Sequence, residues 1–272
     1  MTAVRLQHGA VLAHWRFCLP AAMETIDHLA RMINNARHIA VLSGAGMSTE
    51  SGIPDFRSAN GLFTQNRSFA EVVSIDYFLD CPDGFWDAFR DIFKLKMAGQ
   101  YEPNAGHRFL AWLEQQGKRI SVLTQNIDGL HHKAGSTEVL EMHGSLMGAS
   151  CLSCGTQHDL AWVQQHAVPL CRKCQQVIKP DVVLYGEAVP LIERAFDLAV
   201  NADLVLVMGS SLEVGPVNMI PVEAARYNVP CALINLSDTR LDRFFEVIIR
   251  APIGETCQAL QQQLGETGVA GS

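Results

Sequence analysis

Short apolar runs alternate with amphipathic segments along most of the chain, and the two patterns predict different elements. The runs typical of strands cover residues 38–46, 119–124, 137–144, 182–186, 203–211, 231–237 and 245–249. Helical spacing of apolar residues covers residues 23–37, 104–117, 191–201 and 217–228. Strands that are buried on both faces form nearly continuous apolar runs. Their alternation with helices therefore predicts an α/β fold, in which helices cover both faces of a doubly wound parallel sheet.

Two segments depart from this alternation. Residues 61–103 are rich in aromatic side chains and helical in pattern, and residues 145–185 contain clustered cysteines with little apolar periodicity. We interpret both as insertions that build a smaller lobe. The sheet domain is then expected from residues 23–60, 104–144 and 186–265, with a poorly ordered leader at 1–22 and a tail at 266–272. An alternative for the leader is a start codon placed too early, with Met23 as the true first residue.

The composition limits the classes of function. With 272 residues, 48% of them hydrophobic and 18% charged, the chain can bury a sizeable core. No apolar stretch is long enough to span a bilayer, and the N-terminal segment lacks the clean apolar centre of a secretory signal. We therefore expect a cytoplasmic protein without a membrane partner. The formal net charge of −7 disfavours non-specific nucleic-acid binding and is compatible with a basic peptide as partner.

The first expected strand ends in a glycine turn formed by Gly44, Ala45 and Gly46. Glycines at this position let the backbone approach a pyrophosphate, although roughly half of such isolated matches are plain turns. Thr49 replaces the third glycine of the dinucleotide-binding motif, and the polar segment 48–63 is too long for a passive connection. We interpret this segment as a lid over a cofactor.

Polar side chains also follow the other expected strands. Gln125, Asn126 and Asp128 come directly after the strand at 119–124, and an Asx-type turn would account for only one of them. Further small or polar residues follow later strands at Gly209, Ser210, Ser211 and Asn235. Because the carboxyl ends of parallel strands meet at one edge of a sheet, these groups predict a ligand crevice there. We expect His131 and His132 to be core or exposed residues without a catalytic role.

Four of the eight cysteines form two Cys-x2-Cys pairs, with sixteen residues between the pairs. These are Cys151, Cys154, Cys171 and Cys174. This spacing is typical of zinc sites, and a closed set of four thiolates leaves no open position for water, so we predict a structural zinc ion. The scattered cysteines, Cys18, Cys81, Cys231 and Cys257, are expected to be inert.

His143 follows another expected strand, eight residues before the first cysteine. A lone histidine is more often structural, and a metal-ligand role is a further alternative. Since four cysteines already complete a tetrahedral site, this imidazole remains available for acid–base chemistry at neutral pH.

Taken in order, these motifs resemble those of the sirtuins, the NAD-dependent protein-lysine deacylases. The matching pieces are GAGMSTESGIPDFR, TQNIDGLH, HG, the two Cys-x2-Cys pairs, KPDVVLYGE, GSSLEVGP and INLSD, and the resemblance covers about residues 23–265. Seven motifs in family order are far more specific than any one of them. The resemblance implies a Rossmann-like domain, a small lobe of zinc ribbon plus helices, and a cleft that binds NAD and an acetylated protein or peptide.

The resemblance also implies roles for individual residues. Gly44, Ala45 and Gly46 would hold the pyrophosphate, and the segment 48–63 would be a flexible cofactor-binding loop. The other implied NAD contacts are Ser48, Asp55, Phe56, Arg57, Gln125, Asn126, Ile127, Asp128, His143, Gly209, Ser210, Ser211, Asn235, Leu236 and Ile253. The peptide would pair as an extended strand along Val183, Tyr185, Gly186, Glu187 and Val214.

The implied reaction is NAD-dependent removal of an acetyl group from lysine, giving nicotinamide and O-acetyl-ADP-ribose. The acyl oxygen would attack C1′ of the nicotinamide ribose, and His143, with an ordinary pKa near 6.5, would act as general base beside Asn126. Relatives that prefer acidic acyl groups carry a Tyr-x-x-Arg pair, whereas neither Tyr77 nor Tyr101 has an arginine three residues later. A neutral acyl group, acetyl first, is therefore implied.

Three alternatives share parts of this pattern. An ADP-ribosyltransferase or NAD glycohydrolase would use every cofactor motif but would not need a peptide cleft around Tyr185 and Val214. A non-catalytic NAD- or zinc-dependent binding module fits only if His143 or Asn126 is dispensable. A hydride-transferring dehydrogenase is disfavoured, because no acidic residue lies at the expected ribose-binding distance after the glycines.

Overall fold

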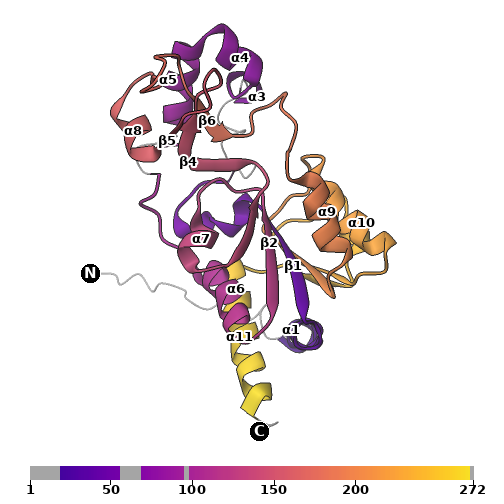
Figure 1. Cartoon of the computed structure of the whole chain (residues 1–272). Helices are drawn as coiled ribbons and strands as arrows, with labels where there is room; N and C mark the ends of the chain where they lie inside the picture. Colours follow the sequence, from indigo (N-terminus) through magenta and orange to yellow (C-terminus); the bar gives the residue numbers. More distant parts are fainter. Residues whose placement is uncertain (1–18, 56–68, 95–97, 270–272) are drawn as a thin grey trace, which may run out of the picture.

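The computed structural model describes residues 19–55, 69–94 and 98–269. These residues form a large lobe around a six-stranded sheet and a small lobe around a three-stranded sheet (Figure 1). In the described part of the chain, no helix is long and apolar enough to cross a lipid bilayer. Most of the leader expected at 1–22 lies outside the described residues, as do Phe56 and Arg57 of the expected cofactor-binding loop.

The strands of the larger sheet all run parallel. They are β1 (His38–Ser43), β2 (Arg119–Thr124), β3 (Glu138–Glu141), β7 (Leu204–Met208), β8 (Cys231–Ile234) and β9 (Val247–Ile249). Their order in the sheet is β3-β2-β1-β7-β8-β9, so the chain builds outward from β1 to one side and then returns to build on the other. This doubly wound topology confirms the predicted α/β fold and creates a switch point between the ends of β1 and β7.

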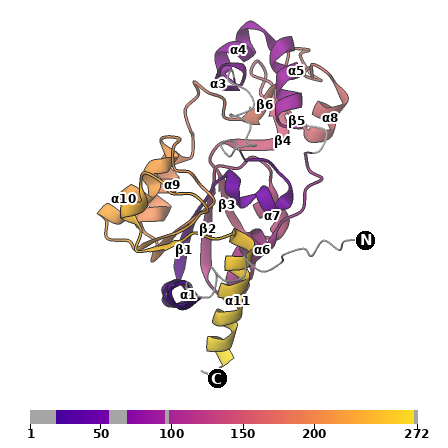
Figure 2. The ribbon, with the colours of Figure 1, turned by 180° about the vertical axis from the view of Figure 1, so that it is seen from behind.

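Helices cover both faces of this sheet, as Figure 1 and Figure 2 show from opposite sides. One face carries α1 (Leu19–Asn35), α6 (Ala105–Gln115) and α11 (Ile253–Val269), and the other carries α9 (Ile192–Val200) and α10 (Ile220–Arg226). Alternation along β1 explains the two cores, since Ile39 and Val41 face the first set of helices while Ala40 and Leu42 face the second. Shorter elements are α7 (Leu130–Ala134), η5 (Val217–Met219) and η6 (Asp242–Phe244).

The carboxyl ends of four neighbouring strands lie in one row of the sheet. Ser43, the last residue of β1, is in register with Thr124 of β2 and with Met208 of β7. Thr124 is in turn in register with Glu141 of β3. The polar segments that follow these strands are therefore brought to one edge, as predicted from their positions in the sequence.

The small lobe combines an antiparallel sheet with short helices. Its elements are α3 (Phe69–Val72), α4 (Ile75–Asp80), α5 (Pro82–Ile92), β4 (Gly144–Ser150), β5 (Gln157–Asp159), α8 (Leu160–Gln165) and β6 (Lys179–Val182). The amphipathic helix α5 buries Phe85, Trp86 and Phe89 against residues of the cysteine-containing segment. The Trp86 indole Nε1–H donates to the Ile178 carbonyl at 3.0 Å, which satisfies the one polar group of this buried ring. The two insertions therefore share one core.

The expected strand at 182–186 is a misassignment. The observed strand β6 ends at Val182 and pairs with β4 in the antiparallel sheet, while Tyr185 forms only an isolated bridge with Ser74. The segment is apolar because it bridges the two lobes: Val183 N–H donates to the His143 carbonyl and Tyr185 N–H donates to the Val73 carbonyl. The expected domain boundaries stay a prediction.

Candidate active site

The glycine turn after β1 packs directly against the loop after β7. The chain continues from Gly44 into two short 3₁₀ turns, η2 (Ala45–Met47) and η3 (Thr49–Ser51), and not into an α-helix. Gly46 N–H donates to the Gly209 carbonyl at 2.8 Å, and a Cβ atom on Gly44 would lie 2.8 Å from the same oxygen. The close approach of two backbones at the switch point thus already requires glycine, before any ligand is considered.

A buried hydrogen-bond network fixes the Asn126 side chain. Its Nδ2 group donates to the Gly44 carbonyl and to Ser48 Oγ, both at 3.0 Å, and Ser48 Oγ donates to Asp128 Oδ2 at 2.7 Å. Because both amide hydrogens are used, the Oδ1 atom of Asn126 is the group that remains for a ligand. Burial raises the pKa of Asp128, against the opposing effect of its hydrogen bonds from Leu130 N–H and Ser48.

Other expected cofactor residues lie around this network. Ser210 Oγ, in the loop after β7, donates to Gln125 Oε1 at 3.0 Å, which ties the ends of β2 and β7 together. Ala45 and Ile127 are half-buried beside the same strand ends, and Ser211 is exposed. The structure thus brings most of the expected cofactor residues to one edge of the sheet; their contacts with NAD stay a prediction.

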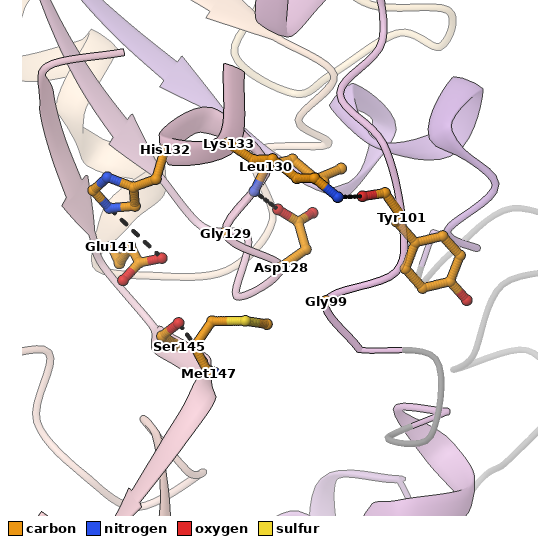
Figure 3. A pocket seen from close by; sticks show the side chains of 10 residues that line it. All are labelled: Gly99, Tyr101, Asp128, Gly129, Leu130, His132, Lys133, Glu141, Ser145 and Met147. Atoms are coloured by element: carbon orange, nitrogen blue, oxygen red, sulfur yellow. Dashed lines mark hydrogen bonds and ion pairs between the residues drawn. The ribbon is translucent and has the colours of Figure 1, made fainter. Parts of the chain in front are cut away.

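A cavity of about 300 Å³ opens beside Asp128, as Figure 3 shows. Leu130, His132 and Met147 also line it, and the ring of Tyr101 stands at its far side. His132 Nε2 lies 4.0 Å from a Glu141 carboxylate oxygen across the cavity wall. The Asp128 carboxylate therefore belongs to the Asn126 hydrogen-bond network and also lines an accessible cavity.

His143 lies between β3 and β4 and is held in one neutral tautomer. Its Nδ1–H donates to the Gln125 carbonyl at 3.1 Å, which leaves the lone pair on Nε2 free to accept a proton. Burial lowers the pKa of His143 below its ordinary value of 6.5, although the hydrogen bond to Gln125 opposes that shift. The expectation of an ordinary pKa therefore does not hold, because the folded chain partly buries the ring.

The lowered pKa predicts how activity depends on pH. A base with a lowered pKa stays neutral to lower pH, so the midpoint of the acid-side fall in kcat/KM should lie below pH 6.5. The measurement is a pH profile of kcat/KM for an acetyl-lysine peptide at saturating NAD. A decline centred above pH 7 would contradict this assignment.

The four clustered cysteines form a site of the size that zinc requires. Their sulfur atoms all lie within 4.8 Å of one another, and no histidine or carboxylate joins them among the described residues. Both Cys-x2-Cys pairs fold into the same turn: Gly155 N–H donates to the Cys151 carbonyl, and Gln175 N–H donates to the Cys171 carbonyl. Hydrogen bonds from Thr156 lower the pKa of Cys154 to about 6, which favours the thiolate that binds a metal. The donor set fits a structural zinc ion.

The segment expected to bind the peptide is tightly held. The buried ammonium of Lys179 lies 3.0 Å from a Glu187 carboxylate oxygen, which also accepts from Leu184 N–H at 2.7 Å. Tyr185 is 39% exposed, whereas the N–H groups of Val183 and Tyr185 are bonded within the chain. A pairing peptide would therefore have to use other main-chain groups, such as those of the exposed Gly186.

The last expected contacts lie farther along the sheet edge. Asn235 follows β8 and donates from Nδ2 to the Ser237 carbonyl at 2.7 Å, and Leu236 is 68% exposed. Ile253 begins α11 and is buried in the core, where its neighbour Gly254 donates its N–H to Glu50 Oε1 at 2.9 Å. This last bond anchors the described start of the expected cofactor-binding loop to α11.

Comparison with known proteins identifies the family. The model of the Sir2 family matches residues 44–216, a stretch that contains the glycine turn, His143 and all four clustered cysteines. The chain belongs to the Sir2 family. Sirtuin relatives include the NAD-dependent protein deacetylase of Chromobacterium violaceum, 59% identical over 89% of this chain and 100% of the relative. The NAD-dependent protein deacetylase of Bacillus subtilis is 46% identical over 88% of this chain and 98% of the relative.

Solved Sir2 structures share the fold. One described as the structural basis for the mechanism and regulation of Sir2 enzymes has a TM-score of 0.81 and 35% identity, and the match covers 90% of this chain and 99% of that chain. A Sir2 structure bound to an acetylated peptide has a TM-score of 0.78 and 32% identity, over 88% of this chain and 98% of that chain. The match includes both lobes of the predicted architecture, which is therefore confirmed at the level of fold.

Proposed function

We propose that the chain is an NAD-dependent protein-lysine deacetylase that converts an acetylated lysine and NAD into free lysine, nicotinamide and O-acetyl-ADP-ribose. The observation that carries the proposal is the position of His143, a neutral imidazole fixed by the Gln125 carbonyl at the sheet edge that also holds Asn126. Relatives with up to 59% identity are named NAD-dependent protein deacetylases, and a Sir2 neighbour was solved with a deacetylated peptide and an acetylated ADP-ribose.

The described residues fit NAD at the switch point. Gly44, Gly46 and Gly209 pack backbone against backbone between the ends of β1 and β7, so a pyrophosphate there would meet backbone groups. When bound, NAD supplies a ribose C1′ whose bond to nicotinamide breaks as the acetyl oxygen of the substrate takes its place. Asn126 and Asp128, held to each other through Ser48, would orient the nicotinamide end.

His143 would act as the general base. Its Nε2 atom would accept a proton released by the ribose hydroxyls, and the Gln125 carbonyl, which accepts from Nδ1–H, would stabilise the resulting imidazolium. Because the ring is neutral at pH 7, it is ready to accept that proton without first losing one.

The proposed substrate is an acetylated protein or peptide that lies along residues 183–187. The Lys179 to Glu187 ion pair holds this segment in place, and the isolated bridge between Ser74 and Tyr185 connects it to the helical insertion. We also propose the cytoplasm as the compartment, because a reducing environment keeps the zinc-binding thiols available for the metal.

Mass spectrometry of an acetyl-lysine peptide incubated with the protein and NAD tests the proposal. We expect the peptide to lose its acetyl group only when NAD is present, and acetylated ADP-ribose to appear among the products. An NAD glycohydrolase would consume NAD and leave the peptide mass unchanged, and that result would overturn the proposal.

The acyl preference gives a separate prediction. No arginine follows Tyr77 or Tyr101 at the third position, so a succinyl carboxylate would enter the site without the Tyr-x-x-Arg partner expected of relatives that prefer acidic acyl groups. Since an unpaired charge costs several times RT to bury, we expect kcat/KM for an acetyl peptide to exceed that for the matched succinyl peptide at least about tenfold. Equal kcat/KM values for the two peptides would show that another cationic group pairs with the succinyl carboxylate.

A further inference from the structure

Two buried histidines lie next to the candidate active site and have no part in the proposed chemistry. His107 is on α6 and His131 is on α7; their side chains are essentially inaccessible, with 0% and 2% exposure. The two ring centroids are 4.8 Å apart and the rings meet edge to face. Buried imidazoles are costly unless their nitrogens have partners, so their contacts need an explanation.

A chain of short hydrogen bonds runs from His131 to the Asn126 turn. His131 Nε2 lies 2.8 Å from Ser43 Oγ, and Ser43 Oγ donates to Thr124 Oγ1 at 2.9 Å. Thr124 Oγ1 also accepts from the main-chain N–H of Asn126 at 3.0 Å. Ser43 and Thr124 are the paired last residues of β1 and β2, so the chain crosses the strand ends on which the site is built.

Each hydrogen bond in this series can be assigned a donor and an acceptor. Since the Ser43 hydroxyl gives its hydrogen to Thr124, Ser43 must accept from His131 Nε2–H, and His131 Nδ1 is then an acceptor. His107 Nδ1 accepts from Asn104 N–H in the capping box of α6, so His107 Nε2 carries a hydrogen. Asn104 Oδ1, 3.0 Å from the same His107 nitrogen, already accepts from two amides of α6.

The two nitrogens that remain are not hydrogen-bonded to each other. His107 Nε2 and His131 Nδ1 are both buried without a partner among the described residues, one a donor and the other an acceptor, on rings that touch. Burial lowers the pKa of both rings, to about 4 for His107, so each stays neutral at pH 7 with one donor and one acceptor. A protonated His131 would turn its acceptor into a second donor and oppose His107.

We propose that His131, supported by His107, is a positioning residue that acts through Ser43 and Thr124 to fix the Asn126 turn in the geometry that binds NAD. The inference rests on the proposed function for its catalytic consequence. Asn126 is held from its side chain by Gly44 and Ser48 and from its main chain by Thr124. Removing the main-chain anchor leaves the turn free to shift, and small shifts of a reactive group are costly in rate.

The test compares variants of the full chain that alter one link each. His131→Leu removes the donor to Ser43 at similar volume, His131→Gln supplies an amide N–H at the place of Nε2, and Ser43→Ala removes the next link. His28→Leu is the control, because His28 is an exposed histidine on α1 and takes no part in this series of hydrogen bonds. Two readouts are measured: kcat/KM for NAD at saturating acetyl peptide, and hydrogen exchange of the Asn126 amide without any substrate.

We expect His131→Leu and Ser43→Ala each to lower kcat/KM for NAD by about 10- to 100-fold with little change in the peptide KM. The double variant should have a kcat/KM no lower than that of either single variant, because both substitutions break the same series of hydrogen bonds. The Asn126 amide should exchange at least about tenfold faster in both single variants, and His131→Gln should restore slow exchange and activity. His28→Leu should behave as the unaltered protein.

Multiplying effects in the double variant, or unchanged Asn126 exchange in Ser43→Ala, would overturn the inference. Failure of His131→Gln to improve on His131→Leu would also overturn it. If His131→Leu does not fold, the hydrogen-exchange rate of the Asn126 amide in Ser43→Ala tests the inference by itself. Because that exchange is measured without substrate, it decides the inference even if the unaltered protein fails to deacetylate the peptide, a result that would refute only the proposed function.

Discussion

Replacing His143 by alanine is expected to lower kcat/KM for an acetyl-lysine peptide by about 10²- to 10⁴-fold, the usual contribution of a general base. The Gln125 carbonyl holds the ring with Nε2 as its free acceptor. Alanine removes the acceptor and leaves the Asn126 network intact, since Asn126 bonds to Gly44, Ser48 and Thr124. Steady-state kinetics measure the effect.

Two controls separate loss of chemistry from loss of structure. The thermal midpoint of His143→Ala should stay close to that of the unaltered protein, because among the described residues the replaced ring has one hydrogen bond, at its Nδ1. His28→Ala removes an exposed histidine of α1 and should retain activity. A His143→Ala variant with undiminished kcat/KM would assign the base to another residue.

Replacing Cys171 by serine is expected to unfold the small lobe and abolish activity. The binding free energy of a structural zinc ion, about 10–16 kcal/mol, exceeds the total stability of a typical domain, so this lobe depends on its metal. Cys171 is fully buried in the core that also contains Phe85 and Trp86, so loss of the metal reaches the helical insertion. Zinc content by elemental analysis and far-ultraviolet circular dichroism measure the two effects.

The matched control is Cys81→Ser, because Cys81 is an exposed free cysteine in the same lobe. It should keep one zinc ion per chain and full activity. The unaltered protein treated with a strong chelator should behave as Cys171→Ser does. A Cys171→Ser variant that retains activity and a folded small lobe without zinc would show that the apolar core alone holds the lobe.

The sequence pattern predicted the large lobe well because its signals are local. Strands buried on both faces are apolar at most positions, so β1, β2, β7 and β8 stand out without knowledge of their neighbours. Polar residues at strand ends predicted the sheet edge near which Asn126 and His143 lie, because the carboxyl ends of parallel strands are at the same edge of a sheet.

Other features depend on partners that are distant in sequence. Residues 182–186 have the apolar pattern of a strand, but their partners His143 and Val73 lie in different lobes, so they form a bridge between lobes. The same reason explains why His131 was expected to have no role in the site: its partner Ser43 is 88 residues away. One local feature of the sequence could have indicated the hydrogen bonds at this position: Ser43 and Thr124 are polar residues at the ends of largely apolar strands.

The pKa of His143 shows the same limit. Sequence position alone suggested an ordinary imidazole, whereas burial in the folded chain lowers its pKa. Burial is a property of the assembled lobes and leaves no mark on the residues next to His143.

The most direct measurement is the stoichiometry of one reaction mixture that contains the protein, NAD and an acetyl-lysine peptide. We predict one nicotinamide and one O-acetyl-ADP-ribose for each lysine freed, throughout the time course. Nicotinamide released in excess of freed lysine, with plain ADP-ribose as its companion, would contradict the account, because NAD cleavage would then not be coupled to removal of the acetyl group.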